Sequence, residues 1–100
     1  MRKVVFSKRA SQRLEKLLEF LELEWSAKVK DNFIKKLDRS IAQIRKYPES
    51  APQSETIKGL HRFVITKQTT LYFRFDSTTI KVAAIFDTRQ HPDKLKKDLN

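Results

Sequence analysis

Residues 61–86 read HRFVITKQTTLYFRFDSTTIKVAAIF, a stretch rich in aromatic and β-branched side chains that alternate with polar ones. Alternation with a period of two is typical of half-buried β-strands. The linkers Lys67–Gln68 and Asp76–Ser77–Thr78 have the length of hairpin turns. We therefore expect three consecutive antiparallel strands, at 61–66, 69–75 and 79–86.

Two amphipathic helices are predicted before these strands. Apolar residues recur at intervals of three and four over 8–24, and again between Ser26 and Tyr47, which is the pattern of a helix with one buried face. Ser7 and Ser26 are suited to cap the two helices, and Pro48 follows the end of the second. Because the junction between the helices is very short, they must fold back as an antiparallel hairpin.

The remaining segments complete one small domain over 1–100. The short apolar run 4–6 favours a first strand that joins the sheet. Residues 48–59 hold two prolines, two serines and the single glycine, which indicates a loop. Residues 87–92 predict a turn, and 93–99 a short C-terminal helix. The fold class is thus α+β in the order β-α-α-β-β-β, with the helix hairpin packed on one face of a small antiparallel sheet.

Composition narrows the function classes. The chain has 22 basic and 12 acidic residues, a net charge of +10, no cysteine, one glycine and two histidines. Disulfides, thiol chemistry and glycine-rich phosphate loops are excluded, and we expect no metal and no cofactor. No signal peptide or membrane span is predicted, so a cytoplasmic protein is expected. The excess of positive charge favours polyanionic partners.

Strand alternation places several candidate residues on the sheet face turned away from the helices. Arg62 on the first of the three strands, and Tyr72 and Arg74 on the next, are predicted to share that face. Lys67 lies in the turn between them, and Arg89 follows the last strand. A basic cleft is expected there, although exposed arginines and lysines are commonly only solvated, and a strand tyrosine is commonly half-buried.

Three further titratable groups, Asp87, His61 and His91, have simpler interpretations as well. Asp87 is predicted to cap the turn before Arg89 through local hydrogen bonds. His61 and His91 are available for acid–base chemistry or are ordinary surface histidines.

Four short segments, VVFSKRA at 4–10, LHRFVI at 60–65, TLYFRF at 70–75 and IFDTRQHP at 85–92, together resemble the RelE/ParE superfamily of bacterial toxins. The resemblance covers nearly the whole chain and rests on the order and spacing of these segments. It implies the toxin of a type II toxin–antitoxin module of the plasmid stabilisation type, neutralised by a cognate antitoxin. The superfamily has a RelE-like branch, which enters the ribosomal A site and cleaves mRNA, and a ParE-like branch, which inhibits DNA gyrase.

Two departures from the RelE-like pattern favour the ParE-like branch. RelE-like nucleases usually place an arginine in the second-to-last strand beside an aliphatic–aromatic pair, whereas here Thr69-Thr70-Leu71-Tyr72 precedes the first arginine, Arg74. They also commonly carry an aromatic residue near the C-terminus, and none follows Phe86. The leading hypothesis is therefore a ParE-like toxin whose target, such as gyrase, is bound by Arg62, Lys67, Tyr72, Arg74 and Arg89.

Two alternatives remain. A ribosome-dependent mRNA endonuclease needs a base, an acid and cations around the phosphate, and Arg62, Arg89 and His91 are its catalytic candidates. A non-toxic nucleic-acid-binding module would explain the charge alone.

An antitoxin surface is expected on the first helix. Phe20 and Leu23 fall outside its apolar stripe, and apolar side chains amid basic charge suit an acidic segment that folds on binding. Phe20 has the alternative role of packing at the hairpin turn. A homodimer or a toxin–antitoxin hetero-oligomer is the expected assembly.

Overall fold

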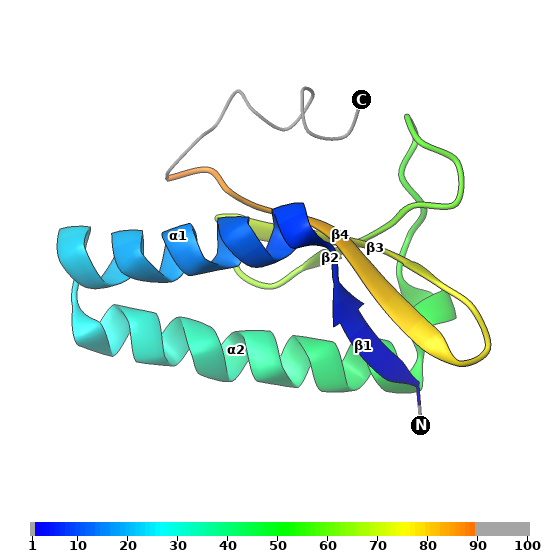
Figure 1. The fold of residues 1–100 in the computed structure, drawn as a ribbon, viewed down its shortest axis with the longest axis horizontal. Helices are drawn as coiled ribbons and strands as arrows, with labels where there is room; N and C mark the ends of the chain where they lie inside the picture. Colours follow the sequence, from blue (N-terminus) through cyan, green and yellow to red (C-terminus); the bar gives the residue numbers. More distant parts are fainter. Residues whose placement is uncertain (1, 90–100) are drawn as a thin grey trace.

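The computed structural model describes residues 2–89, which form a helix hairpin and a four-stranded sheet (Figure 1). The predicted C-terminal helix at 93–99 and the second half of the turn at 87–92 lie outside these residues. The elements, in chain order, are β1 (Lys3–Phe6), α1 (Lys8–Glu24), α2 (Ala27–Lys46), the short 3₁₀ helix η1 (Pro48–Ser50), β2 (His61–Val64), β3 (Thr69–Phe75) and β4 (Thr79–Asp87).

Serine caps start both helices, as predicted. The Ser7 hydroxyl accepts a hydrogen bond from the Ala10 amide at 3.0 Å, and the Ser26 hydroxyl accepts one from the Val29 amide at 3.1 Å. Each bond satisfies an amide that the first turn of a helix leaves without a partner. The chain between the helices is so short that α1 and α2 lie side by side as a hairpin (Figure 1).

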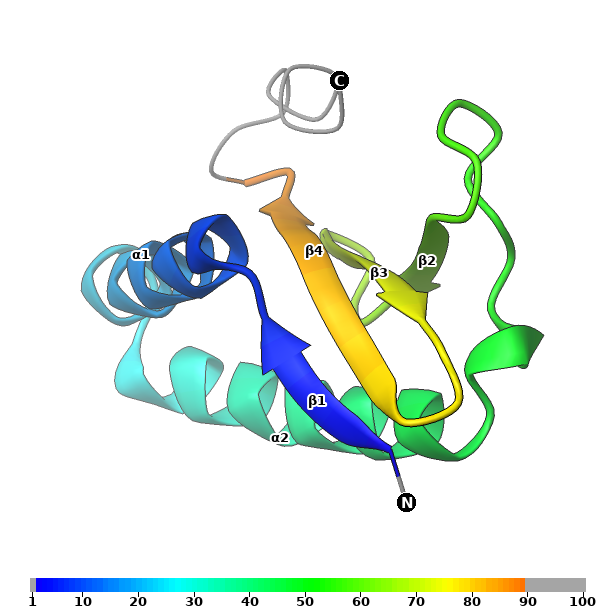
Figure 2. The same ribbon diagram turned by 45° about the vertical axis from the view of Figure 1, so that its right-hand side comes forward.

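The sheet has the strand order β1-β4-β3-β2. The pairs β2–β3 and β3–β4 are antiparallel, as predicted, but β1 runs parallel to β4, so the expectation of a purely antiparallel sheet is wrong. The helix hairpin is the reason: α2 returns the chain to the end of the sheet where β1 began, so β2 and then β4 run in the direction of β1 (Figure 2).

The first hairpin turn is two residues longer than the alternation predicts, since β2 ends at Val64 rather than at residue 66. The Thr66 hydroxyl accepts hydrogen bonds from the amides of Gln68 and Thr69, both at 3.1 Å. This side chain competes with strand pairing and turns the backbone early.

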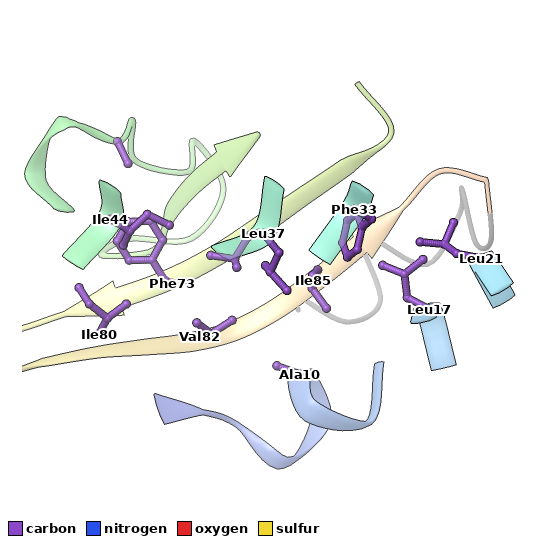
Figure 3. Close-up of a cluster of buried hydrophobic side chains, with 12 residues drawn as sticks. Ala10, Leu17, Leu21, Phe33, Leu37, Ile44, Phe73, Ile80, Val82 and Ile85 are labelled. Atoms are coloured by element: carbon purple, nitrogen blue, oxygen red, sulfur yellow. The ribbon is translucent and has the colours of Figure 1, made fainter. Parts of the chain in front are cut away.

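The main core lies between the helix pair and one face of the sheet (Figure 3). Leu17 and Leu21 of α1 and Phe33 of α2 meet Phe73 of β3 and Val82 of β4 there. These side chains are at most 3% exposed. The helical stripes and one of the two alternating strand faces predicted from the sequence therefore pack against each other.

A register shift in the β3–β4 pairing lies between Tyr72 and Phe73, because β4 carries one extra residue, Ala83, at that point. The extra residue is a β-bulge, which bends the strand and increases its twist. The Ser7 hydroxyl donates to the Ala83 carbonyl at 3.2 Å, and the Ser7 amide donates to the Val82 carbonyl at 2.9 Å. Ser7 thus joins the start of α1 to the bulge in β4.

Candidate target-binding face

The far face is the face of the sheet opposite the main core, and it carries Arg62, Tyr72, Arg74, Ala84 and Phe86. Arg62 lies directly across the β2–β3 pair from Tyr72, and Tyr72 lies across the β3–β4 pair from Ala84. The prediction that Arg62, Tyr72 and Arg74 share one face is therefore confirmed. Arg62 is exposed, so its guanidinium is accessible to a partner.

Tyr72 is buried instead of lining an open cleft, and this part of the prediction is wrong. It is 7% exposed and forms a second apolar cluster with Leu60, Ala84 and Phe86. The rings of Tyr72 and Phe86 meet edge to face, 6.1 Å apart. Burial raises the pKa of the Tyr72 phenol, an effect that the charge of Arg62 partly offsets.

The loop before β2 accounts for this burial. Leu60 belongs to the second cluster, and Ile57 packs against it. The Ser54 amide donates to the Leu60 carbonyl at 2.6 Å, and the Arg62 amide to the Pro52 carbonyl at 2.9 Å, so the loop is held along the edge of β2. In the sequence, the aliphatic residues Ile57 and Leu60 among polar loop residues are the signal that this loop covers an apolar surface.

Arg74 holds this loop in place. Its Nη1 donates to the Lys58 carbonyl at 2.9 Å. The next residue, Gly59, has a φ of +79°, the left-handed region that favours glycine. A Cβ at Gly59 would lie 2.9 Å from Nη1 of Arg74. Arg74 is exposed, so the same side chain positions the loop and presents positive charge.

Arg89 is engaged in a buried polar cluster at the end of β4. Its Nε donates to Oδ1 of Asp87 at 2.9 Å, and its Nη2 donates to Oδ2 at 2.7 Å. The Thr69 hydroxyl donates to the same Oδ2 at 2.6 Å. The guanidinium carbon also lies 5.5 Å from the centre of the Trp25 ring. Arg89 therefore links β4 to the junction between α1 and α2.

The pKa values in this cluster follow from its hydrogen bonds. Burial alone would raise the pKa of Asp87, but the hydrogen bonds from Arg89 and Thr69 outweigh it and lower that pKa. The bond to Asp87 raises the pKa of Arg89. The Arg89 amide also donates to Oδ1 of Asp87 at 2.9 Å, so the predicted cap of this turn by Asp87 is confirmed.

Two further cations lie near the far face. Lys67 is exposed in the β2–β3 turn. Arg13 of α1 was not predicted, and its guanidinium carbon lies 5.9 Å from the centre of the Phe86 ring. Arg13 follows the buried Ala10 by three residues, so it lies on the flank of the apolar stripe of α1. This spacing is the signal in the sequence that could have placed Arg13 beside the sheet.

His61 lies on the helix side of the sheet. Its Nδ1 is 2.8 Å from the Ala51 carbonyl oxygen, and its ring lies 5.5 Å from that of Phe73 and 5.0 Å from that of Phe75. These contacts make it a structural side chain. His91 lies outside the described residues.

The two predicted antitoxin residues differ in their surroundings. Phe20 is partly buried and packs against the main core, so its alternative packing role is confirmed. Leu23 is 80% exposed. Trp25, which follows it at the end of α1, is 56% exposed. Leu23 and Trp25 thus form an exposed apolar pair at the tip of the helix hairpin.

Within residues 2–89, no three histidine, cysteine, aspartate or glutamate side chains come together in a way that could hold a metal ion. The helices in this part of the chain are too short or too polar to cross a membrane.

The chain belongs to the ParE toxin family of type II toxin–antitoxin systems, whose model matches residues 4–92. Its fold is similar to that of a solved chain described as the chromosomal ParDE toxin–antitoxin system from P. aeruginosa. The TM-score is 0.72 at 10% sequence identity, and the match covers 87% of this chain and 96% of that one. No curated protein matches the sequence. The RelE/ParE resemblance and its ParE-like branch are thereby confirmed.

Proposed function

We propose that this toxin acts in the bacterial cytoplasm by binding a macromolecular target, DNA gyrase, through the far face, and that a cognate antitoxin neutralises it. The observation that carries the proposal is that the candidate acid–base side chains are engaged within the fold, whereas two candidate cations are exposed. Tyr72 is buried, His61 is bonded to the Ala51 carbonyl and Arg89 is bonded to Asp87, while Arg62 and Lys67 are exposed.

This contrast between engaged acid–base groups and exposed cations favours binding over catalysis. RNA cleavage needs an accessible base and acid beside the phosphate. In residues 2–89, the phenol of Tyr72 is buried with a raised pKa, and His61 is on the opposite side of the sheet. The far face instead presents the cations Arg62 and Arg74 around an apolar cluster, which suits contact with an acidic surface.

The test is a supercoiling assay with purified gyrase and the purified toxin. We expect inhibition, and we expect the double variant Arg62→Ala/Lys67→Ala to need roughly tenfold more toxin, because each exposed ion pair contributes up to about 1 kcal/mol. The matched control is Lys35→Ala/Lys36→Ala, which removes two exposed charges from α2 and should inhibit like the wild type. Unchanged supercoiling, together with cuts in ribosome-bound mRNA mapped by primer extension, would contradict the proposal.

The antitoxin contact is proposed at the tip of the helix hairpin, with Leu23 as its anchor. Leu23→Lys should weaken capture of the cognate antitoxin because a charge replaces an apolar contact. Lys28→Leu, which changes an exposed residue on α2, serves as the control. Equal antitoxin affinity for the Leu23 variant and the wild type in calorimetry would remove Leu23 from the contact.

A further inference from the structure

A basic hollow lies at the end of the sheet away from Arg89. It is an open surface depression of about 610 Å³, lined by Arg2, Arg45, Lys46, Ser77 and Thr78. These residues come from the start of the chain, the last turn of α2 and the β3–β4 turn, which lie close together at one corner of the molecule (Figures 1 and 2). Nothing in the proposed target-binding face uses this corner.

Both arginines in the hollow are held through Nε, and their terminal nitrogens form no hydrogen bond within residues 2–89. Arg2 donates from Nε to the Asp76 carbonyl at 2.9 Å, and Arg45 donates from Nε to the Arg2 carbonyl at 2.9 Å. The Arg2 guanidinium carbon also lies 5.7 Å from the centre of the Phe75 ring. These contacts orient both guanidinium groups before any ligand arrives, which reduces the entropy lost on binding.

The cations of the hollow are not neutralised from within the described chain. Within residues 2–89, Arg2, Arg45 and Lys46 form no ion pair with a carboxylate. Asp76 is the acidic residue of the adjoining turn, and its Oδ1 accepts hydrogen bonds from the amides of Thr78 and Thr79 and from the Thr78 hydroxyl. These bonds lower the pKa of Asp76, so it stays ionised and places one negative charge beside the hollow. The three cations Arg2, Arg45 and Lys46 outnumber it, so the hollow keeps a positive excess.

We propose that this hollow binds a phosphate group of a nucleic-acid backbone. Two arginines, a lysine and the Ser77 hydroxyl supply more donors than one carboxylate can accept, whereas a nucleic-acid backbone carries two charged non-bridging oxygens on each of its closely spaced phosphates. The net charge of +10 attracts a polyanion to the molecule as a whole. The hollow gives that attraction one localised contact.

The first test measures binding of a labelled duplex DNA by fluorescence anisotropy over a range of salt concentrations. Arg2→Gln/Arg45→Gln/Lys46→Gln should reduce affinity about tenfold and lower the slope of log affinity against log salt by about one for each phosphate that the variant no longer neutralises. The matched control Lys28→Gln/Lys35→Gln/Lys36→Gln removes the same charge from exposed positions on α2. It should keep the wild-type slope.

Arg45 also supports the fold through its bond to Arg2, so Arg2→Gln/Lys46→Gln is measured alongside and should show a smaller decrease in affinity. Equal decreases for the hollow and control variants, or wild-type binding by the hollow variants, would overturn the proposal. An absence of DNA binding at low salt would overturn it too.

A second test distinguishes a nucleic-acid phosphate from free inorganic phosphate, and both of these from an acidic peptide. In amide NMR spectra, duplex DNA should shift Ser77 and Thr78, inorganic phosphate should shift the same amides more weakly, and a polyglutamate peptide should not. Shifts of these amides by the peptide alone would overturn the proposal. The outcome is independent of gyrase, because neither test contains it.

Discussion

At the scale of single residues, several charged side chains that the sequence indicated as functional candidates form mainly structural contacts. Arg89 and Asp87 form a two-point ion pair in which the Asp87 side chain is fully buried and that of Arg89 is 18% exposed. Arg74 holds the Lys58 carbonyl and crowds Gly59. A pattern of charges in a sequence therefore indicates where charge is placed, while the contacts decide which charges remain available.

Asp87→Asn tests the polar cluster. It removes the charge from hydrogen bonds made by Arg89 and Thr69, so the free energy of unfolding should fall by about 1.5–3 kcal/mol. Because the folded pKa of Asp87 is lowered, its contribution is present above about pH 4 and is lost as the pH falls through that lowered value.

Urea unfolding of the Asp87 variant and the wild type at neutral pH and at about pH 3 measures this difference. The gap in stability should narrow at the lower pH. Asp38→Asn, which changes an exposed carboxylate on α2, is the control. A gap that is the same at both pH values would show that the charge of Asp87 is not what stabilises the cluster.

Gly59→Ala tests the loop that covers Tyr72. An alanine at positive φ costs about 1–2 kcal/mol, and its Cβ would displace the Arg74 guanidinium from the Lys58 carbonyl. A double-mutant cycle with Arg74→Ala separates the two effects. We expect Gly59→Ala to lower the unfolding free energy less in the Arg74→Ala background, because only the backbone strain remains. An unchanged effect would place all of it in the backbone.

At the scale of elements, local sequence patterns predicted most of the secondary structure. Contacts between residues distant in sequence, or local side-chain bonds, explain where the observed elements differ from the prediction. Both helices begin at their serine caps and span the predicted stripes. β3 has the predicted bounds, whereas β2 stops early because the Thr66 hydroxyl caps the turn. The bulge at Ala83 has no signal in the alternation of β4, since it is stabilised by Ser7, far away in the sequence.

The two serine caps should differ in strength. Ser26→Ala removes one cap bond and should cost about 1 kcal/mol of unfolding free energy. Ser7→Ala should cost more, by up to about 1 kcal/mol, because its hydroxyl also donates to the Ala83 carbonyl. Ser11→Ala, inside α1 and exposed, should be neutral or stabilising by about 0.5 kcal/mol. Thermal or urea unfolding measures all three, and equal effects for Ser7 and Ser26 would contradict the link to the bulge.

At the scale of the whole molecule, periodicity and turn lengths predicted the layers, the helix hairpin and the three-stranded meander. The direction of β1 and the burial of Tyr72 depend on how segments distant in sequence meet. Periodicity assigns a residue to a face and does not say what covers that face. Of the predicted target-binding residues, Arg62, Lys67 and Arg74 are exposed, Arg89 is paired, and Tyr72 lies beneath the loop.

The net charge of +10 should itself lower the stability of the folded chain, because like charges are closer together when it is compact. Unfolding free energy near neutral pH should therefore rise between about 20 mM and about 500 mM NaCl, as the screening length shortens from roughly 20 Å to a few ångströms. Lys28→Glu/Lys36→Glu changes exposed residues of α2 and lowers the net charge by two units at each site, from +10 to +6. Its stability should depend less on salt.

Phosphate buffer at matched ionic strength separates general screening from a bound ion. Screening alone predicts equal stabilisation by chloride and phosphate, whereas a ligand that binds only the folded state adds stability that increases with its concentration. The extra stabilisation by phosphate should disappear in Arg2→Gln/Arg45→Gln/Lys46→Gln and persist in Lys28→Glu/Lys36→Glu. A wild-type stability that falls with NaCl would show instead that local ion pairs, such as that of Glu22 with Lys30 at 3.3 Å, outweigh the repulsion.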